Sequence, residues 1–137
     1  MFRTALISMF LTSTALADTW TVDDDGPADF SSIQDAVDAA STGDSIQVFP
    51  GIYNESVQVW DKVLTIEKFD TGDVGEVLLD GTGLEAQALI YVSPNNHGTM
   101  IKGITFQNSP NKGIWIDNCD NSSISSSSLA LISFSYY

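Results

Sequence analysis

The sequence has few cations, one cysteine and one histidine. Its 137 residues contain five Lys and Arg against 18 Asp and Glu, a formal net charge of −13 at pH 7. A surface of this sign repels phosphate groups, so neither nucleic acid nor an anionic membrane is an expected partner. Cys119 has no second cysteine for an internal disulfide. We expect it to be a small buried side chain, the alternative being a free reactive thiol.

The first 17 residues have the pattern of a secretory signal peptide. Arg3 supplies the positive charge, Ala5–Leu11 is a short apolar run, and an Ala-Leu-Ala triplet at 15–17 forms a cleavage motif before Asp18. The apolar run is too short to cross a bilayer, although an uncleaved anchor is the alternative. We therefore expect a secreted protein, extracellular or periplasmic, with no membrane contact after cleavage.

A single helix is predicted, within residues 18–45. Ser31 or Ser32 is suited to be its N-cap, and Gly43 stops it. Four apolar residues recur on one face of this helix: Ile33, Ala36, Val37 and Ala40. The helix is expected to cover the open end of the first turn of a sheet structure, whose unpaired edge would otherwise recruit other chains.

Short apolar strands separated by turn residues follow this helix. They are predicted at 46–49, 57–59, 63–66, 77–79, 89–92, 101–106, 114–116 and Ile124. Ile66, Ile90 and Ile114 lie 24 residues apart, as do Val77 and Ile101. This period, without further helices, predicts an all-β fold, a parallel β-helix (β-solenoid) with an N-terminal capping α-helix. Leucine-rich repeats need a Leu/Asn template that is absent, and an immunoglobulin-like sandwich lacks this register.

The interpretation divides the chain into four parts. These are a signal peptide at 1–17, an N-terminal strand and capping helix at 18–45, β-helix coils at 46–128 and an atypical tail at 129–137. Because solenoids need a polar cap and this tail is apolar and aromatic, the chain is expected to be truncated at its C-terminus. The alternatives are that the tail is a final strand, or that the open end permits end-to-end self-association.

Two segments carry a family resemblance. One runs from Asp25-Gly26 to Val57, with Asp-Phe at 29–30, Ile-Gln at 33–34, Ala-Val at 36–37 and Pro-Gly-Ile-Tyr-Asn-Glu at 50–55; the other is Ile-Thr-Phe-Gln-Asn at 104–108. The chain resembles pectin-lyase-like right-handed parallel β-helix proteins. Its N-terminal coils are similar to those of pectin methylesterases and of β-helix proteins named only for their repeats. The resemblance implies a β-helix fold and contact with extracellular polysaccharide.

The resemblance transfers no catalytic residue. In the esterases the catalytic motifs follow the Thr-Phe-x-Asn strand, whereas here Asn108 is followed by Ser-Pro-Asn-Lys-Gly-Ile-Trp-Ile-Asp at 109–117, which matches none of them. The family's catalytic arginine has no counterpart either, because Arg3 is the last arginine in the sequence. Other chemistries are no better supplied. A polysaccharide lyase would need a lysine such as Lys102 as its base, but this side chain is expected to be exposed and solvated. A glycosidase would need two facing carboxylates, whereas Asp117 and Asp120 are expected to lie at a strand end and in a turn.

The candidate binding residues are Glu67, Tyr91 and Trp115. In the 24-residue register they occupy equivalent positions on successive coils, beside inward-facing isoleucines, so strand alternation directs them outward. Sugar rings stack on aromatic faces, and a carboxylate accepts hydrogen bonds from hydroxyl groups. The alternative is that loops cover these aromatics and they extend the core. A slip in register would break the column.

A calcium site is possible at Asp23, Asp24 and Asp25, because clustered carboxylates suit this hard cation. The alternative is a solvated acidic turn. No other cofactor is required. The sequence thus favours a secreted β-helix module that contacts extracellular polysaccharide as a binding or scaffold protein. The alternatives are the N-terminal fragment of a pectin-active enzyme (pectinesterase-like or polysaccharide lyase) and a structural surface protein.

Overall fold

The computed structural model describes residues 16–70, 72, 75–125 and 132–135, and within them has one helix and twelve strands. The helix α1 spans Ile33–Ala39. The strands are β1 (Thr19–Val22), β2 (Ser45–Val48), β3 (Gly51–Tyr53), β4 (Val57–Val59), β5 (Thr65–Lys68), β6 (Val77–Asp80), β7 (Ala88–Val92), β8 (Met100–Lys102), β9 (Ile104–Gln107), β10 (Lys112–Asp117), β11 (Ser123–Ser125) and β12 (Ile132–Ser135).

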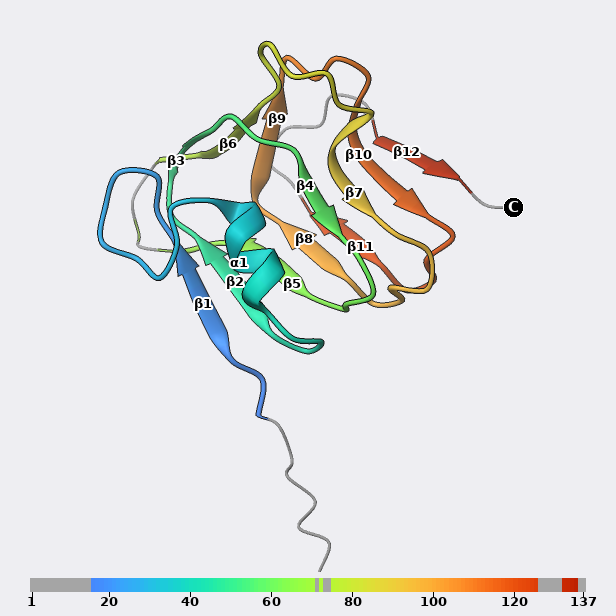
Figure 1. Cartoon of the computed structure of the whole chain (residues 1–137), viewed down its shortest axis with the longest axis horizontal. Helices are drawn as coiled ribbons and strands as arrows, with labels where there is room; N and C mark the ends of the chain where they lie inside the picture. Colours follow the sequence, from blue (N-terminus) through green and yellow to red (C-terminus); the bar gives the residue numbers. More distant parts are fainter. Residues whose placement is uncertain (1–15, 71, 73–74, 126–131, 136–137) are drawn as a thin grey trace, which may run out of the picture.

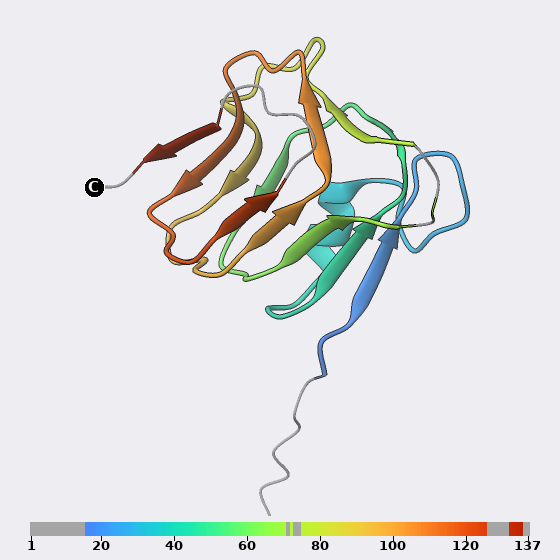
Figure 2. The same cartoon turned by 180° about the vertical axis from the view of Figure 1, so that it is seen from behind.

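These strands form three sheets in which every described pairing is parallel. Sheet A has the order β1-β2-β5-β8-β11, sheet B the order β3-β6-β9, and sheet C the order β12-β10-β7-β4. From β2 to β11 the chain passes from sheet A to B to C and back to A, as the colour gradient in Figures 1 and 2 makes visible. The described part of the chain is therefore mostly parallel β structure with one short helix.

The core lies between the three sheets and consists of side chains stacked in columns. In sheet A, Ile46, Ile66 and Ile101 are paired neighbours and fully buried. Val57, Ile90 and Ile114 form the equivalent fully buried column in sheet C. Like residues on adjacent parallel strands pack closely along such a column and stabilise the sheets through burial of apolar area.

Helix α1 agrees with the sequence prediction in its position and its cap. Ser32 is the N-cap, and its hydroxyl accepts a hydrogen bond from the backbone N–H of Asp35 at 3.4 Å. The predicted apolar face is buried, and the helix packs against β1, β2 and β4 (Figure 1). It ends at Ala39, shortly before Gly43, which adopts a φ of +100°.

The register of the sheets differs from the prediction. Ile90 and Ile114 are partners as expected, but Ile66 belongs to sheet A, where it pairs with Ile46 and Ile101. The expected match of Val77 with Ile101 is also wrong, since Val77 pairs with Ile104. The physical reason is that the turns between strands differ in length. The number of residues per coil therefore varies even within one sheet, and a single period of 24 residues does not apply.

Two strand predictions also needed correction. The segment 101–106 is not one strand, because Gly103, with a φ of +67°, separates β8 in sheet A from β9 in sheet B. Strand β3 was missed, because its first residue belongs to a Pro-Gly pair that predicts a turn. Parallel pairing with β6 draws Gly51–Tyr53 into sheet B nonetheless.

The predicted signal peptide and the predicted tail lie partly outside the residues that the structure describes. Of the signal peptide, residues 1–15 lie outside the described part of the chain, and of the tail only residues 132–135 lie inside it. There β12 pairs with β10, in line with the alternative of a final strand. Cys119 is buried, as predicted.

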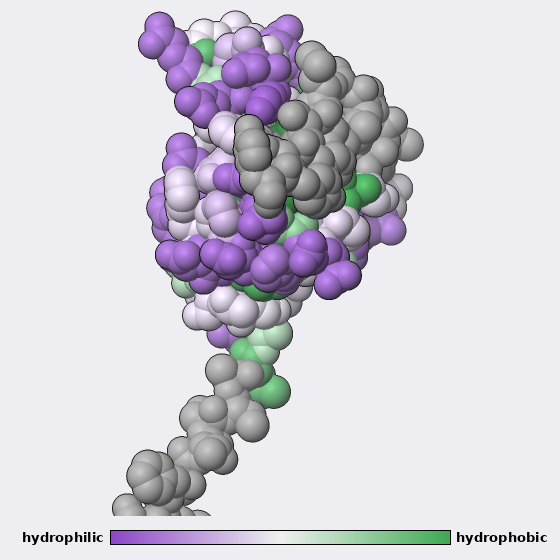
Figure 3. Space-filling model, turned by 90° about the vertical axis from the view of Figure 1, so that its right-hand side faces the viewer, coloured by the Kyte–Doolittle hydropathy of each residue, from purple (hydrophilic) through white to green (hydrophobic). Residues whose placement is uncertain are grey.

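One face of the described surface is largely polar. Seen from the right-hand side of Figure 1, it is mainly hydrophilic, with small apolar patches between charged and polar side chains (Figure 3). The helix in the described ranges is neither long enough nor apolar enough to cross a membrane.

Candidate functional site

A pocket of about 620 Å³ lies on the outer face of sheet C. Its floor comes from β4, β7 and β10, and the loop between β6 and β7 forms one wall. Ten residues line it: Ser56, Gln58, Trp60, Leu84, Glu85, Ala86, Gln87, Ala88, Tyr91 and Trp115. Concave sites of this size, with apolar walls and a few polar groups, are the usual form of small-ligand sites.

Three aromatic rings dominate this pocket. The ring centroids of Trp60 and Tyr91 are 5.0 Å apart, and those of Tyr91 and Trp115 are 5.2 Å apart in an edge-to-face arrangement. The Nζ of Lys112 lies 3.9 Å from the centroid of the Trp115 ring, a cation–π distance. Trp60 is 52% exposed, so a large part of its surface is open to a ligand. We call Trp60, Tyr91 and Trp115 the aromatic shelf.

Hydrogen bonds hold two of the three shelf side chains, Trp60 and Tyr91, in place. The indole N–H of Trp60 donates to Oε1 of Gln58 at 3.1 Å, and the backbone N–H of Gln58 donates to Oε1 of Gln34 on α1 at 2.7 Å. The hydroxyl of Tyr91 approaches Oδ2 of Asp117 at 3.5 Å. Burial, followed by the negative charge of Asp117, raises the pKa of Tyr91, so its phenol is neutral at physiological pH.

Tyr91 and Trp115 are brought together as the sequence predicted, whereas Glu67 is not. Tyr91 pairs with Trp115 across β7 and β10, but its partner on the other side is Gln58. Glu67 is in sheet A, where it pairs with Gln47 and Lys102 and lies 3.5 Å from the Lys102 Nζ. The predicted column of Glu67, Tyr91 and Trp115 is therefore wrong, and the actual column is Gln58, Tyr91 and Trp115.

No family model, no curated protein and no solved structure matches the chain. The function must come from the geometry.

Sequence reasoning missed eight of the ten pocket residues, among them Gln58, Trp60 and Glu85. The chain segment from Gln58 to Tyr91 is longer than the segment from Tyr91 to Trp115. The cause is the turns on either side of β6, which lengthen the first segment. A fixed period cannot detect such a pairing. The one available signal was Trp60 itself, a large aromatic directly after the alternating strand Val57–Val59, where a turn is expected.

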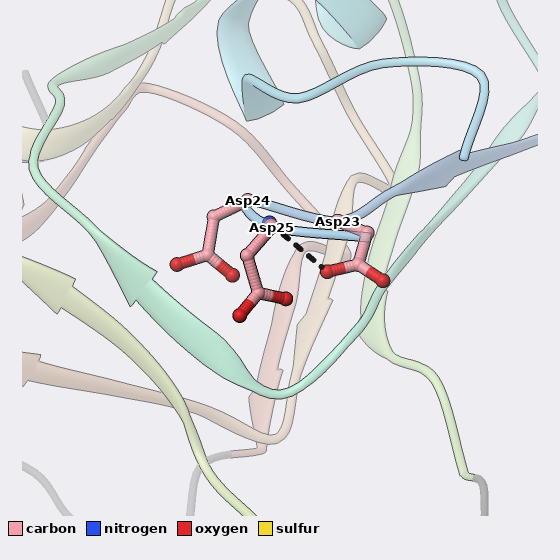
Figure 4. A group of neighbouring side chains, drawn as sticks. All are labelled: Asp23, Asp24 and Asp25. Atoms are coloured by element: carbon pink, nitrogen blue, oxygen red, sulfur yellow. Dashed lines mark hydrogen bonds between the residues drawn. The ribbon is translucent and has the colours of Figure 1, made fainter. Parts of the chain in front are cut away.

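Asp23, Asp24 and Asp25 lie together on the turn after β1, as Figure 4 shows. Each offers one carboxylate oxygen, and these oxygens all lie within 4.8 Å of one another. Two of the carboxylates also have structural contacts. Asp23 accepts the backbone N–H of Asp25 at 3.4 Å, and Asp24 accepts that of Ile52 at 3.2 Å. Calcium binding at this turn stays a prediction. A structural role for the turn is supported by the hydrogen bonds that Asp23 and Asp24 accept.

The remaining polar candidates are dispersed. Asp120 donates its backbone N–H to Nδ1 of His97 at 2.7 Å, which ties two turns together. The carboxylate of Asp117 contacts the hydroxyl of Tyr91. Lys102 is paired with Glu67. These residues therefore have local structural partners, and none of them is among the residues that line the pocket, although Asp117 contacts Tyr91.

Proposed function

We propose that this chain is a secreted right-handed parallel β-helix module that binds an extracellular polysaccharide at the aromatic shelf. The observation that carries the proposal is the pocket on sheet C, in which Trp60, Tyr91 and Trp115 stand side by side on a rigid parallel sheet.

The β-helix part of the proposal rests on the order of the strands. Each strand from β5 to β10 pairs with the strand three positions earlier, which is the pattern of one coil stacked on the last. A right-handed path is favoured because parallel crossover connections have that hand in about 98% of cases. We also propose that the chain belongs to the pectin-lyase-like group. In such a protein an N-terminal helix closes the first coil, and α1, which packs against β1, β2 and β4, would be that helix.

The sugar-binding part rests on the chemistry of the pocket. A pyranose ring has apolar C–H faces and a rim of hydroxyl groups, so it needs aromatic surface below and polar side chains around. The shelf supplies the surface, and Gln58, Glu85 and Gln87 supply amide and carboxylate groups. The pocket is open to solvent on the outer side of a sheet, where a chain of sugars is able to run past it.

The charge of the protein favours neutral glycans. A net charge of −13 repels polyuronates, and Glu85 adds a negative charge at the pocket wall. Lys112, beside Trp115, is the cation closest to the shelf in the described contacts. A polyuronate such as pectin would need this lysine or bridging calcium to bind.

Affinity electrophoresis through soluble glycans tests the proposal. The chain from Asp18 onwards would be run with xylan, glucomannan and polygalacturonate, the last with and without calcium. Trp60→Ala is the main variant, because Trp60 is exposed and its loss spares the core. Phe69→Ala is the control, since Phe69 packs on Phe49 at the end of sheet A, away from the pocket.

We expect retention by at least one neutral glycan, and a loss of affinity of about tenfold for Trp60→Ala with little change for Phe69→Ala. Equal retention of both variants would overturn the shelf as the binding site. Failure of the unmodified chain to bind any glycan would favour the structural surface protein. Release of reducing ends, unsaturated products or methanol from pectin would favour the enzyme alternative.

A further inference from the structure

A buried carboxylate lies at the start of the folded chain. Asp44 is only 4% exposed, and its Oδ1 accepts the backbone N–H of Asp18 at 2.9 Å. Its Oδ2 accepts the backbone N–H of Ser41 at 2.8 Å and the indole N–H of Trp20 at 3.2 Å. In the described contacts all three of its donors are neutral N–H groups.

Asp18 is also the residue at which regular structure begins. Its carbonyl accepts the backbone N–H of Ser45 at 2.9 Å, and β1 starts at the next residue. Leu16 and Ala17, just before it, are exposed, Leu16 to 83%. The Ala-Leu-Ala motif predicted for signal cleavage thus ends at the boundary between exposed chain and folded sheet.

We propose that hydrolysis of the Ala17–Asp18 peptide bond places the new α-ammonium group of Asp18 on the buried carboxylate of Asp44. In this step water adds to the carbonyl carbon of Ala17 and the C–N bond breaks. Ala17 keeps the water oxygen as part of its new carboxylate, and both protons of the water pass to the nitrogen of Asp18, which becomes an ammonium. The protease is a signal peptidase by class. The product is an ion pair that the uncleaved chain does not make.

The nitrogen atom is already in position, so cleavage changes charge rather than geometry. A backbone amide donates one neutral hydrogen bond, whereas an ammonium donates up to three, each charge-assisted and about twice as strong. A carboxylate that is buried without a counter-charge is costly, and supplying that charge relieves the cost. Removal of the leader therefore stabilises the first strand pair, β1 with β2, in the processed form.

Other charges face this position. The side-chain carboxylate of Asp18 is exposed, and Lys62 exerts a weaker attraction on Asp44 from the α1 side, where its Nζ binds the carbonyls of Val37 and Asp38. Hydrogen bonds from Ser41 and then Asp18 already lower the pKa of Asp44, so it is ionised at neutral pH. Its counter-charge within hydrogen-bonding distance would be the new ammonium.

Two chains test the pairing: one that begins at Asp18, and one extended by Leu16 and Ala17, which moves the terminal charge about 7 Å away. Both keep a nitrogen donor at this position, an ammonium in the first chain and a neutral amide N–H in the second. Urea unfolding at pH 7 is expected to give an unfolding equilibrium constant at least tenfold smaller for the chain that begins at Asp18. Asp44→Asn in both chains should remove this difference.

The pH dependence provides a readout that needs no variant. An α-amino group has an ordinary pKa of about 8, and pairing raises it in the folded protein. The added stability is therefore complete below pH 8 and is lost as the pH rises through the raised value.

The N-terminus of the exported chain, read by mass spectrometry, should be Asp18. Equal stability of the two chains at pH 7, or a mature terminus at another residue, would overturn the proposal. Neither result affects the glycan site.

Discussion

The carboxylate of Glu55 closes the amino-terminal end of α1. Its Oε1 accepts the backbone N–H of Ile33 at 2.8 Å, and its Oε2 accepts that of Gln34 at 2.9 Å. The hydroxyl of Ser32 donates to the same Oε2 at 2.9 Å. A residue from the turn before β4 thus satisfies helix N–H groups that have no partner within the helix, and its negative charge lies at the positive end of the helix dipole.

Replacing Glu55 with Ala should therefore destabilise the protein. The change leaves the N–H groups of Ile33 and Gln34 without this acceptor in a partly buried position, and we expect a loss of about 1–3 kcal/mol in the free energy of unfolding. Urea unfolding followed by circular dichroism measures it. Glu76→Ala is the control, since that side chain is exposed, and it should change stability by less than about 0.5 kcal/mol. Equal effects would show that Glu55 is not a cap.

Asp80 should make the protein sensitive to acid. The side chain of Asn108 donates to its carboxylate at 3.0 Å, and Thr82 donates from both its hydroxyl and its backbone N–H. These hydrogen bonds, with that of Asn108 the strongest influence, lower the pKa of Asp80 below its ordinary 3.8. A lowered pKa in the folded state means that the contribution is complete above pH 3.8 and is lost as the pH falls through the folded value.

Asp80→Asn tests this contribution. At pH 7 the variant should be less stable than the unmodified chain, and the two should converge as the pH falls through the lowered pKa of Asp80. Unfolding curves at intervals from pH 7 to pH 2 provide the comparison. A constant difference across this range would mean that ionisation of Asp80 does not support the fold.

Cys119 should react slowly in the native protein. Its thiol is buried, and Sγ lies 3.0 Å from the carbonyl oxygen of Ser93 and 3.1 Å from that of Asp117. Burial above all raises the pKa of this thiol, which reduces the reactive thiolate further. Labelling with a thiol-specific reagent should be about 10³-fold slower or more in buffer than in urea, because it requires unfolding. A native rate within tenfold of the unfolded rate would identify an accessible thiol instead.

Glu85 should set the charge preference of the pocket. If the shelf binds glycans, Glu85→Gln removes a negative charge from the wall and should raise the affinity for polygalacturonate about threefold at low salt, with little change for a neutral glycan. Glu76→Gln makes the same change in net charge outside the pocket and is the matched control. A similar gain for both variants would assign the effect to overall charge.

The helix was predictable because its signals are local. The N-cap at Ser32, the apolar face from Ile33 to Ala40 and the nearby Gly43 all lie within a dozen residues, and the structure has them as expected. The acceptor Glu55 was not predictable, because it comes from beyond two further strands. Tyr91 and Trp115 were matched correctly because the chain between their strands has close to the assumed length.

Local sequence patterns were enough to predict the kind of surface and the kind of element: an acidic exterior, a capped helix and short apolar strands with alternating burial. These depend on charge, turn chemistry and side-chain periodicity, which act over a few residues. Which strands become neighbours depends on long-range packing and followed from the folded structure alone. Pairing in a parallel sheet depends on how far each turn carries the chain, so it placed Gln58 rather than Glu67 beside Tyr91 and brought Trp60 and Glu85 to the same pocket.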